Sequence, residues 1–330
     1  MKILVTGGSG FIGSNFINNQ IKNTDNEILN FDKLTYASNN DNLSSIESSG
    51  KYRFVHGDIC DKNTLTKAFN EFLPNIVVHF AAESHVDNSI NEPEGFITSN
   101  IIGTFNLLKI SLKYQHSDIV DDFKFIHIST DEVYGSIEHP ELFTENSPYR
   151  PNSPYSASKA ASDHLVRSWN KTYNLTTVIT NCSNNYGPYQ YEEKLIPLVI
   201  KKSLELSDIP IYGDGLNIRD WLFVDDHCDA INTIIKKGLS GQSYNIGGNN
   251  QVSNLEIVKK ICAILDYKRP RSDSKKYSNL IKLVNDRPGH DRRYAVDFSK
   301  ISQDLLWRPK HTFDTGIEKT ISWYLENKGW

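Results

Sequence analysis

Residues 129–159 hold side chains that could carry out proton transfer. The segment 129–132 reads Ser-Thr-Asp-Glu, and Tyr155 and Lys159 follow within the segment Tyr-Ser-Ala-Ser-Lys. Residues four apart share one face of a helix, and a nearby ammonium favours the charged form of a phenol. We therefore expect Lys159 to lower the pKa of Tyr155, so that the phenol acts as a base near neutral pH.

Asp131 and Glu132 extend this set with two neighbouring acids directly after an apolar run. Two carboxyl groups at the end of a strand can divide roles, one donating a proton to a leaving hydroxyl and the other removing a proton from carbon. A base and a hydride carrier together imply redox chemistry on a carbinol, and the two acids could serve the loss of a hydroxyl group.

A glycine turn near the start of the chain indicates where a hydride carrier would bind. An apolar segment, Ile3–Val5, runs into Gly7 and then into the spacing Gly8-x-Gly10-x-x-Gly13. This spacing between a strand and a helix is typical of a site for a dinucleotide pyrophosphate.

Asp32 ends the next apolar run, 19 residues after Gly13, where an acid can accept hydrogen bonds from the adenosine ribose. Because a carboxylate repels a 2′-phosphate, the cofactor is predicted to be NAD, not NADP. The segments His56-Gly-Asp58-Ile59 and Phe80-Ala-Ala82 are predicted to form further walls of this site.

The order of apolar and helical segments predicts the fold. Apolar runs lie at 3–5, 28–31, 53–56, 76–80, 125–128 and 177–180. They alternate with helix-like stretches at about 11–22, 61–72, 94–115 and 154–173. Such alternation predicts an α/β fold with a doubly wound parallel sheet of Rossmann type. Shorter elements rich in Gly, Pro and Asn follow residue 185. We expect an NAD-binding domain over 1–184 and a smaller substrate-binding lobe over 185–330, with some later segments returning to the first domain.

Composition narrows the classes of partner. The 330 residues carry a net charge of −4 without a basic stripe, which argues against a nucleic acid as the main partner. Four scattered cysteines indicate neither a disulfide framework nor a zinc site, and no metal is expected. No apolar run reaches membrane-spanning length. We expect a cytoplasmic protein that acts on a small molecule, with Arg219 and Lys194 as candidates to neutralise a substrate diphosphate.

Longer motifs carry a resemblance to a known family. They include TGGSGFIGS at 6–14, AAESHVD at 81–87, STDEVYG at 129–135, PYSASKA at 154–160, EKLIPL at 193–198 and RPGHDRRYA at 287–295. In these the chain resembles the extended short-chain dehydrogenase/reductase superfamily and, within its nucleotide-sugar branch, the dTDP-glucose 4,6-dehydratase family. The resemblance runs nearly from end to end.

The resemblance implies a reaction and assigns residues to its steps. Tyr155 with Lys159 would oxidise the sugar C4 hydroxyl while NAD takes the C4 hydride, and Thr130 would hydrogen-bond the C4 oxygen. Glu132 would remove the C5 proton and Asp131 would protonate the departing C6 hydroxyl. The hydride would then return to C6, giving dTDP-4-keto-6-deoxyglucose.

The resemblance also implies binding residues and a homodimer formed through helices near 94–115 and 154–173. For the cofactor these are Gly7, Gly10, Phe11, Ile12, Gly13, Asp32, Lys33, Leu34, Thr35, Asp58, Ile59, Ala81, Ala82, Ser84, Ser99, Tyr155, Lys159 and Asn185. For the nucleotide sugar they are Ser84, Thr130, Asn184, Lys194, Leu195, Pro210, Tyr212, Arg219, Asn254 and His290.

Three alternatives stay open at this point. A nucleotide-sugar 4-epimerase would need Tyr155, Lys159 and NAD but no acid pair. A UDP-glucose 4,6-dehydratase would share the whole catalytic set and differ in the base that it recognises. Ser38, Asn88 and Glu192 depart from the usual family pattern, so the choice between thymine and uracil is open. A catalytically silent NAD-sensing protein is disfavoured by the intact catalytic residues.

Overall fold

A seven-stranded parallel sheet forms the centre of the larger lobe. The structure, a computed structural model, describes residues 1–117 and 119–327. The strands follow the order β3-β2-β1-β4-β5-β6-β10, and every neighbouring pair is parallel. The bounds are β1 (Lys2–Thr6), β2 (Glu27–Asp32), β3 (Tyr52–His56), β4 (Ile76–His79), β5 (Lys124–Thr130), β6 (Thr177–Cys182) and β10 (Ser243–Ile246). The predicted doubly wound parallel sheet is confirmed.

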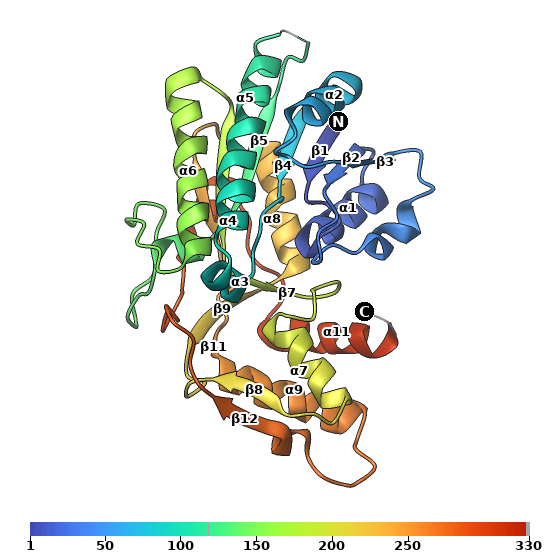
Figure 1. Ribbon diagram of the computed structural model, residues 1–330, viewed down its shortest axis with the longest axis vertical. Coiled ribbons are helices and arrows are strands. Elements are labelled where there is room, and N and C mark those ends of the chain that lie inside the picture. Colours follow the sequence, from blue (N-terminus) through green and yellow to red (C-terminus); the bar gives the residue numbers. More distant parts are fainter. Residues whose placement is uncertain (118, 328–330) are drawn as a thin grey trace.

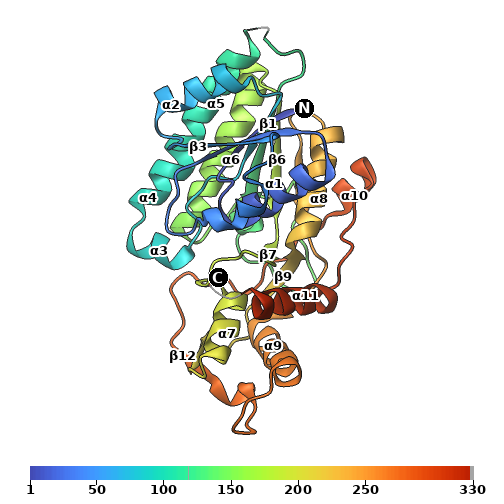
Figure 2. The same ribbon diagram turned by 90° about the vertical axis from the view of Figure 1, so that its right-hand side faces the viewer.

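Helices cover both faces of this sheet (Figures 1 and 2). One face carries α1 (Phe11–Asn23), α8 (Val224–Lys237) and α10 (Ser299–Leu305), and the other carries α2 (Lys62–Phe72), α5 (Thr104–Gln115) and α6 (Pro154–Tyr173). Because successive strand residues point to opposite faces, Val5 packs in the cluster with Phe16 and Ile231, whereas Leu4 packs in the cluster with Leu108. The predicted helices over 11–22, 61–72 and 154–173 correspond to α1, α2 and α6.

The predicted helix over 94–115 is continuous but not uniform. It consists of α4 (Glu94–Phe96), a π-helical stretch η2 (Ile97–Gly103) and α5, and it follows the short helix α3 (Val86–Asn91). Figure 1 shows α5 beside α6 along one side of the molecule.

The smaller lobe has a core of its own below the sheet. It contains a three-stranded sheet of β7 (Asn184–Tyr186), β9 (Ile218–Phe223) and β11 (Gln251–Ser253), and the pair β8 (Ile209–Tyr212) and β12 (Ile281–Val284). Helices α7 (Leu195–Leu204), α9 (Asn254–Lys268) and α11 (Phe313–Glu326) surround them. Tyr186, Ile200, Ile261 and Ile321 lie in one buried cluster. Short helical turns are η1 (Asn40–Ile46), η3 (Asp131–Tyr134) and η4 (Tyr277–Leu280).

The expectation of short elements after residue 185 is wrong. Helices α8, α9 and α11 are 14, 15 and 14 residues long. In α8 the buried positions Val224, Cys228, Ile231 and Ile235 recur at helical spacing among polar residues, which hide the pattern in the composition.

Three later segments pack in the larger lobe. Strand β10 pairs with β6 at the edge of the main sheet, and α8 and α10 contribute to the core on the α1 face. We propose a division near residue 184 in which α8, β10 and α10 belong to the first domain.

Candidate active site

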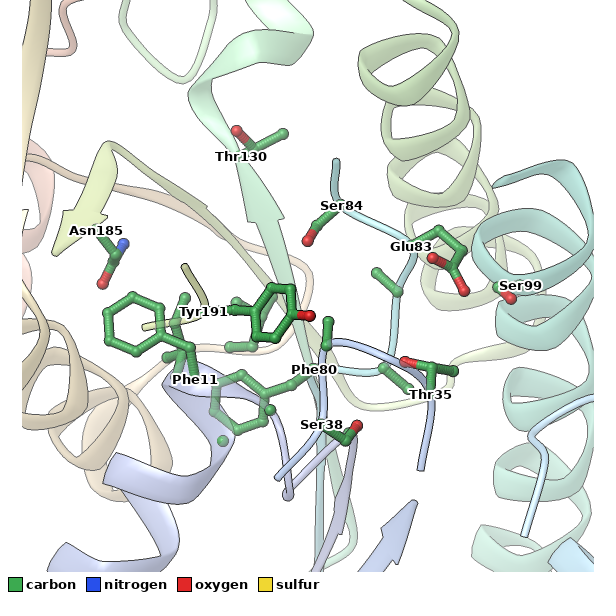
Figure 3. A pocket seen from close by; sticks show the side chains of 18 of the residues that line it. Phe11, Thr35, Ser38, Phe80, Glu83, Ser84, Ser99, Thr130, Asn185 and Tyr191 are labelled. Carbon is green, nitrogen blue, oxygen red and sulfur yellow. The ribbon is translucent and has the colours of Figure 1, made fainter. Parts of the chain in front are cut away.

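A cavity of about 310 Å³ opens where the main sheet meets the smaller lobe. Its walls come from the ends of β1, β2, β4, β5 and β6, where the carboxyl ends of parallel strands form the usual ligand crevice. Figure 3 shows Phe11, Phe80 and Tyr191 gathered near the glycine turn and Thr130 at the end of β5. One continuous cavity therefore joins the predicted cofactor end to the predicted catalytic end.

Most of the predicted cofactor residues line this cavity. They are Gly7, Gly10, Phe11, Ile12, Gly13, Asp32, Lys33, Thr35, Asp58, Ile59, Ala81, Ala82, Ser84, Ser99, Tyr155, Lys159 and Asn185. Leu34 is outside the lining. Its backbone N–H donates to Asp32 Oδ1 at 2.8 Å, so it helps to hold the acid in place.

The glycine turn brings backbone close to the cavity. Gly7 has φ +72°, and a Cβ there would lie 2.5 Å from the backbone nitrogen of Ala81. A Cβ on Gly13 would lie 2.4 Å from the Gly7 carbonyl oxygen. Gly10 precedes α1 and has no side chain to cap it, so the first N–H groups of α1 are open to an anion. These features fit a dinucleotide diphosphate.

Asp32 lines the cavity at the end predicted to bind the ribose. Its Oδ2 accepts a hydrogen bond from the Ser9 backbone N–H at 2.8 Å. Lys33 pairs with Asp58 at 2.7 Å, which ties the end of β2 to the segment that follows β3. The Asp32 Oδ1 accepts from the Leu34 N–H and from the Ser38 hydroxyl at 3.2 Å, so an acceptor position remains on Oδ2 for a ribose hydroxyl.

The acid pair lies at the other end of the cavity. Strand β5 ends at Thr130, whose hydroxyl accepts a hydrogen bond from the Glu132 N–H at 3.2 Å and caps η3. Asp131 is 1% exposed, and its Oδ2 has no hydrogen-bond partner among the described residues. Burial raises the pKa of Asp131 well above the ordinary range, and the neighbouring Glu132 raises it further.

Glu132 has a different electrostatic environment. Loss of solvent raises its pKa, but the positive charges of Arg219, Arg287 and Lys194 oppose this shift. Two neighbouring acids with surroundings of this kind can hold one proton between them, with Asp131 as the protonated member.

Helix α6 places Tyr155 and Lys159 against the same cavity. Its start is capped: the Ser153 side chain accepts a hydrogen bond from the Ser156 N–H, and Pro154 is the first residue of the helix. The Lys159 Nζ donates to the Ile128 carbonyl oxygen at 2.8 Å.

The expected low pKa of Tyr155 is wrong for the protein alone. Burial is the main cause that raises the pKa of this phenol well above its usual value, and Glu132, Cys182 and Asp131 add to it. The ammonium of Lys159 does not offset burial and the three neighbouring groups. Spacing on the helix predicted the proximity of the two residues but not the strength of the desolvation.

The predicted substrate residues divide into two groups. Ser84, Thr130, Asn184 and Lys194 line the cavity, whereas Leu195, Pro210, Tyr212, Arg219, Asn254 and His290 lie outside its lining. Arg219 is buried on β9, donates to the Asp291 carbonyl oxygen at 2.9 Å and lies 4.2 Å from the Tyr294 ring centroid. It nevertheless acts on Glu132 through its charge.

The remaining members of the second group lie around the lobe. Leu195 begins α7, Pro210 is on β8, and the Asn254 N–H donates to the Asn217 carbonyl oxygen at 3.0 Å. The Tyr212 hydroxyl donates to Asp87 Oδ2 at 3.2 Å, and its ring centroid lies 6.4 Å from that of His290.

Several cavity residues were not predicted. They are Phe31, Ala37, Ser38, Glu83, Ile128, Cys182, Ser183, Gln190, Tyr191 and Glu193. Many follow the ends of parallel strands, and this position was the signal available in the sequence. Arg287 was also missed; it pairs with Asp87 at 2.8 Å across 200 residues of chain.

Within residues 1–117 and 119–327, no cluster of three or more His, Cys, Asp or Glu side chains could hold a metal ion. Over the same residues, no helix has the length and apolar character needed to cross a membrane.

Comparison with known proteins places this site in a family. The family model described as GDP-mannose 4,6 dehydratase matches residues 4–320. The chain belongs to this family. It is 53% identical to the dTDP-glucose 4,6-dehydratase of Salmonella typhimurium, with 100% of the chain and 94% of that protein covered. Identity to dTDP-glucose 4,6-dehydratase 1 of Escherichia coli K12 is 52%, with the same coverage.

Solved structures of two dTDP-glucose 4,6-dehydratases have the same fold as this chain. A dTDP-glucose 4,6-dehydratase from Bacillus anthracis in complex with NAD is 44% identical, with a TM-score of 0.89 and coverage of 100% of this chain and 98% of that one. The Streptomyces venezuelae enzyme, also with NAD bound, is 41% identical, with a TM-score of 0.92 and the same coverage. The UDP-glucose 4-epimerase of Thermus thermophilus is 28% identical, with a TM-score of 0.86 and coverage of 98% and 99%. The scaffold is thus shared with epimerases, and the site must separate the two reactions.

Proposed function

We propose that this protein is an NAD-dependent dTDP-glucose 4,6-dehydratase, a hydro-lyase that forms dTDP-4-keto-6-deoxyglucose. The observation that carries the proposal is the Asp131–Glu132 pair in one cavity with Tyr155 and Lys159. An epimerase has no water to eliminate and no need of an acid pair. The relatives at 52–53% identity over the whole chain support the dTDP-sugar as substrate.

The residues of this chain divide the proton transfers among them. Bound NAD supplies the hydride acceptor for C4, the hydride donor for C6 and a positive nicotinamide ring. Tyr155 takes the proton of the C4 hydroxyl, with Lys159 as the neighbouring charge, while Thr130 binds the C4 oxygen. Glu132 takes the C5 proton, which the C4 ketone has made acidic, and later returns it.

Asp131 supplies the proton that the departing hydroxyl needs. A carboxyl group kept neutral by burial is a general acid at neutral pH, because its proton is still present when the C6–O bond breaks. The proton joins the C6 oxygen and water leaves. Glu132 is the base because the three cations favour its charged form relative to that of Asp131.

We propose that the two ends of the cavity bind the two nucleotides. The lining residues from the glycine turn, Asp32 and the ends of β3 and β4 contact NAD. Lys194, Arg219 and Arg287, all close enough to act on Glu132, neutralise the substrate diphosphate. Asn184, whose Oδ1 is buried and unpaired among the described residues, binds the substrate near the reacting sugar.

We further propose a cytoplasmic homodimer. All four cysteines are free, which suits a reducing compartment. Ile97 and Ile102 on η2 are 47% and 48% exposed beside the face of α5 and α6, and dimerisation would bury them.

Substrate comparison tests the proposed function. Purified protein is incubated separately with dTDP-glucose, UDP-glucose and GDP-mannose, and products are identified by NMR. We expect a 4-keto-6-deoxy product, formed fastest from dTDP-glucose. NAD should be released when the protein is denatured, because the hydride must stay bound between the two half-reactions. Release of dTDP-galactose would indicate an epimerase. Faster turnover of UDP-glucose would indicate that the enzyme prefers uracil to thymine.

A further inference from the structure

Helix α6 carries a third buried ionisable residue one turn beyond Lys159. Tyr155, Lys159 and Asp163 are spaced by four, which places them along one helix face. Lys159 is 4% exposed and Asp163 is 2% exposed. The proposed reaction gives Asp163 no role, although burial of an ionisable carboxyl group is costly unless it is paired or hydrogen-bonded.

Asp163 is held by donors from three other segments. Its Oδ2 accepts hydrogen bonds from the hydroxyl of Ser129 at 2.9 Å, the hydroxyl of Tyr149 at 2.9 Å and the side-chain amide of Asn181 at 3.2 Å. Its Oδ1 lies 3.3 Å from His127 Nε2. Three donors converging on one oxygen stabilise a negative charge there. The same contacts tie α6 to the ends of β5 and β6.

The carboxylate of Asp163 and the ammonium of Lys159 reach adjacent residues of β5, the Ser129 hydroxyl and the Ile128 carbonyl oxygen. Burial lowers the pKa of Lys159, and Asp163 is the largest influence that raises it again. The other ionisable groups around the ammonium, besides Tyr155, are His79 on β4, His127 on β5 and Cys182 on β6. Burial lowers the pKa of His127 to about 4 and that of His79 well below its usual value, and it raises that of Cys182 to about 12. These three are therefore neutral at neutral pH.

We propose that Asp163 is a positioning residue that keeps Lys159 charged and thereby prepares Tyr155 to take a proton from the substrate. Its negative charge balances a buried ammonium that touches the cavity, and its hydrogen bonds fix that helix face against Ser129, the residue before Thr130. The last step of this inference rests on the proposed function, whereas the effect on the charge of Lys159 does not.

The variant Asp163→Asn separates charge from shape. An amide oxygen can accept from the three donors, and the amide NH₂ can face His127 Nε2, which is neutral and able to accept. The control Tyr149→Phe removes one of the hydrogen bonds and keeps the carboxylate. If Asp163→Asn does not fold, the pair Asp163→Glu and Asp163→Gln differs only in charge and gives the same comparison.

Two measurements are made on each variant. NMR of protein labelled with ¹³C at lysine Cε follows the titration of Lys159, whose signal is assigned by its loss in Lys159→Met. The second is the pH dependence of bound-cofactor reduction after mixing with dTDP-glucose. In Asp163→Asn we expect the titration of Lys159 and the alkaline limb of the reduction rate to move down by about one pH unit. We expect both to stay at the parental pH in Tyr149→Phe.

The inference is overturned if Asp163→Asn titrates Lys159 at the parental pH, or if Tyr149→Phe moves the titration as far. A shifted titration with an unmoved reduction profile also overturns the proposed link to Tyr155. If the parent protein reduces its cofactor with no nucleotide sugar, the proposed function fails, and the NMR titration still decides the charge of Lys159.

Discussion

The two acids after β5 differ in what surrounds them. Asp131 is buried with an unpaired oxygen, while Glu132 is partly exposed and faces three cationic side chains. Because a low-dielectric environment disfavours charge and nearby cations restore it, the first acid is suited to donate a proton and the second to accept one. The proposed roles of Asp131 and Glu132 therefore follow from the environment of each carboxyl group.

A pH dependence follows from the raised pKa of Glu132. As pH falls, the base is protonated and elimination stops, so the acid limb of a single-turnover elimination should lie above the 4.5 of an ordinary glutamate. Product formation after rapid mixing with dTDP-glucose, measured from about pH 4 to about pH 8, gives this limb. A midpoint at or below 4.5 would exclude the proposed environment of the base.

The double variant Asp131→Asn with Glu132→Gln should separate oxidation from elimination. It keeps the shape of both side chains and removes the acid and the base, so Tyr155 and Lys159 can still oxidise C4. We expect reduced nicotinamide to accumulate, followed by its absorbance, while 6-deoxy product falls by at least about a hundredfold. Glu138→Gln, at an exposed acid outside the cavity, is the control. Undiminished product would exclude the assigned roles.

Tyr155→Phe removes the hydroxyl and keeps the packing of the ring. Turnover should fall by about two to four orders of magnitude, the usual range for loss of a general base. The free energy of unfolding should stay at the parental value. Tyr173→Phe on the same helix is the matched control, because that ring is 46% exposed at the far end of α6. Near-parental turnover of Tyr155→Phe would make it an ordinary helix residue.

At the residue scale, the sequence predicted which side chains meet but not their protonation. The glycine turn, Asp32, Thr130 and the Tyr155–Lys159 pair carry signals in local spacing, and all line one cavity. The raised pKa of Tyr155 depends on how many other segments cover it, which no local pattern contains. Arg287 could not be placed for the same reason, since its partner is 200 residues away.

At the scale of elements, prediction succeeded where each strand is followed by a helix that covers it. The first four such units carry clear apolar runs, so the parallel sheet and α1, α2 and α6 follow from them. The later helices α8, α9 and α11 were missed because their apolar positions stand among Asp, Asn and Lys. The pairing of β10 with the edge of the main sheet depends on tertiary packing, which no local sequence pattern contains.

The turn between β1 and α1 allows a direct test of an element. Gly7→Ala would place a Cβ 2.5 Å from the Ala81 backbone nitrogen in a backbone conformation, φ +72°, that disfavours alanine. We expect a loss of about 1–3 kcal/mol in the free energy of unfolding and a lower content of bound NAD. Gly50→Ala, where a Cβ meets nothing within 4 Å, is the control. Equal stability and NAD content in both variants would contradict the close approach.

At the scale of the whole molecule, polar contacts join the two lobes around the cavity. Asp87, at the start of α3, pairs with Arg287 and accepts a hydrogen bond from Tyr212, both from the smaller lobe. The Lys194 Nζ also donates to the Ser84 carbonyl oxygen at 2.9 Å. A substrate bound between the lobes would meet groups from both.

The proposed homodimer would bury an apolar face that one chain leaves open. Ile97 and Ile102 lie on η2 beside α5 and α6, and the cost of exposing them is removed if a second copy covers them. We expect a native mass of about twice the 37.6 kDa of one chain by light scattering.

The double variant Ile97→Arg with Ile102→Arg should be monomeric and should still release NAD on denaturation, because charge at this face opposes only association. The control is Leu239→Arg with Leu306→Arg, two residues that are 60% and 82% exposed elsewhere. A monomeric parent protein would contradict the proposed homodimer. Equal dissociation of the control variant would contradict the placement of the interface at Ile97 and Ile102.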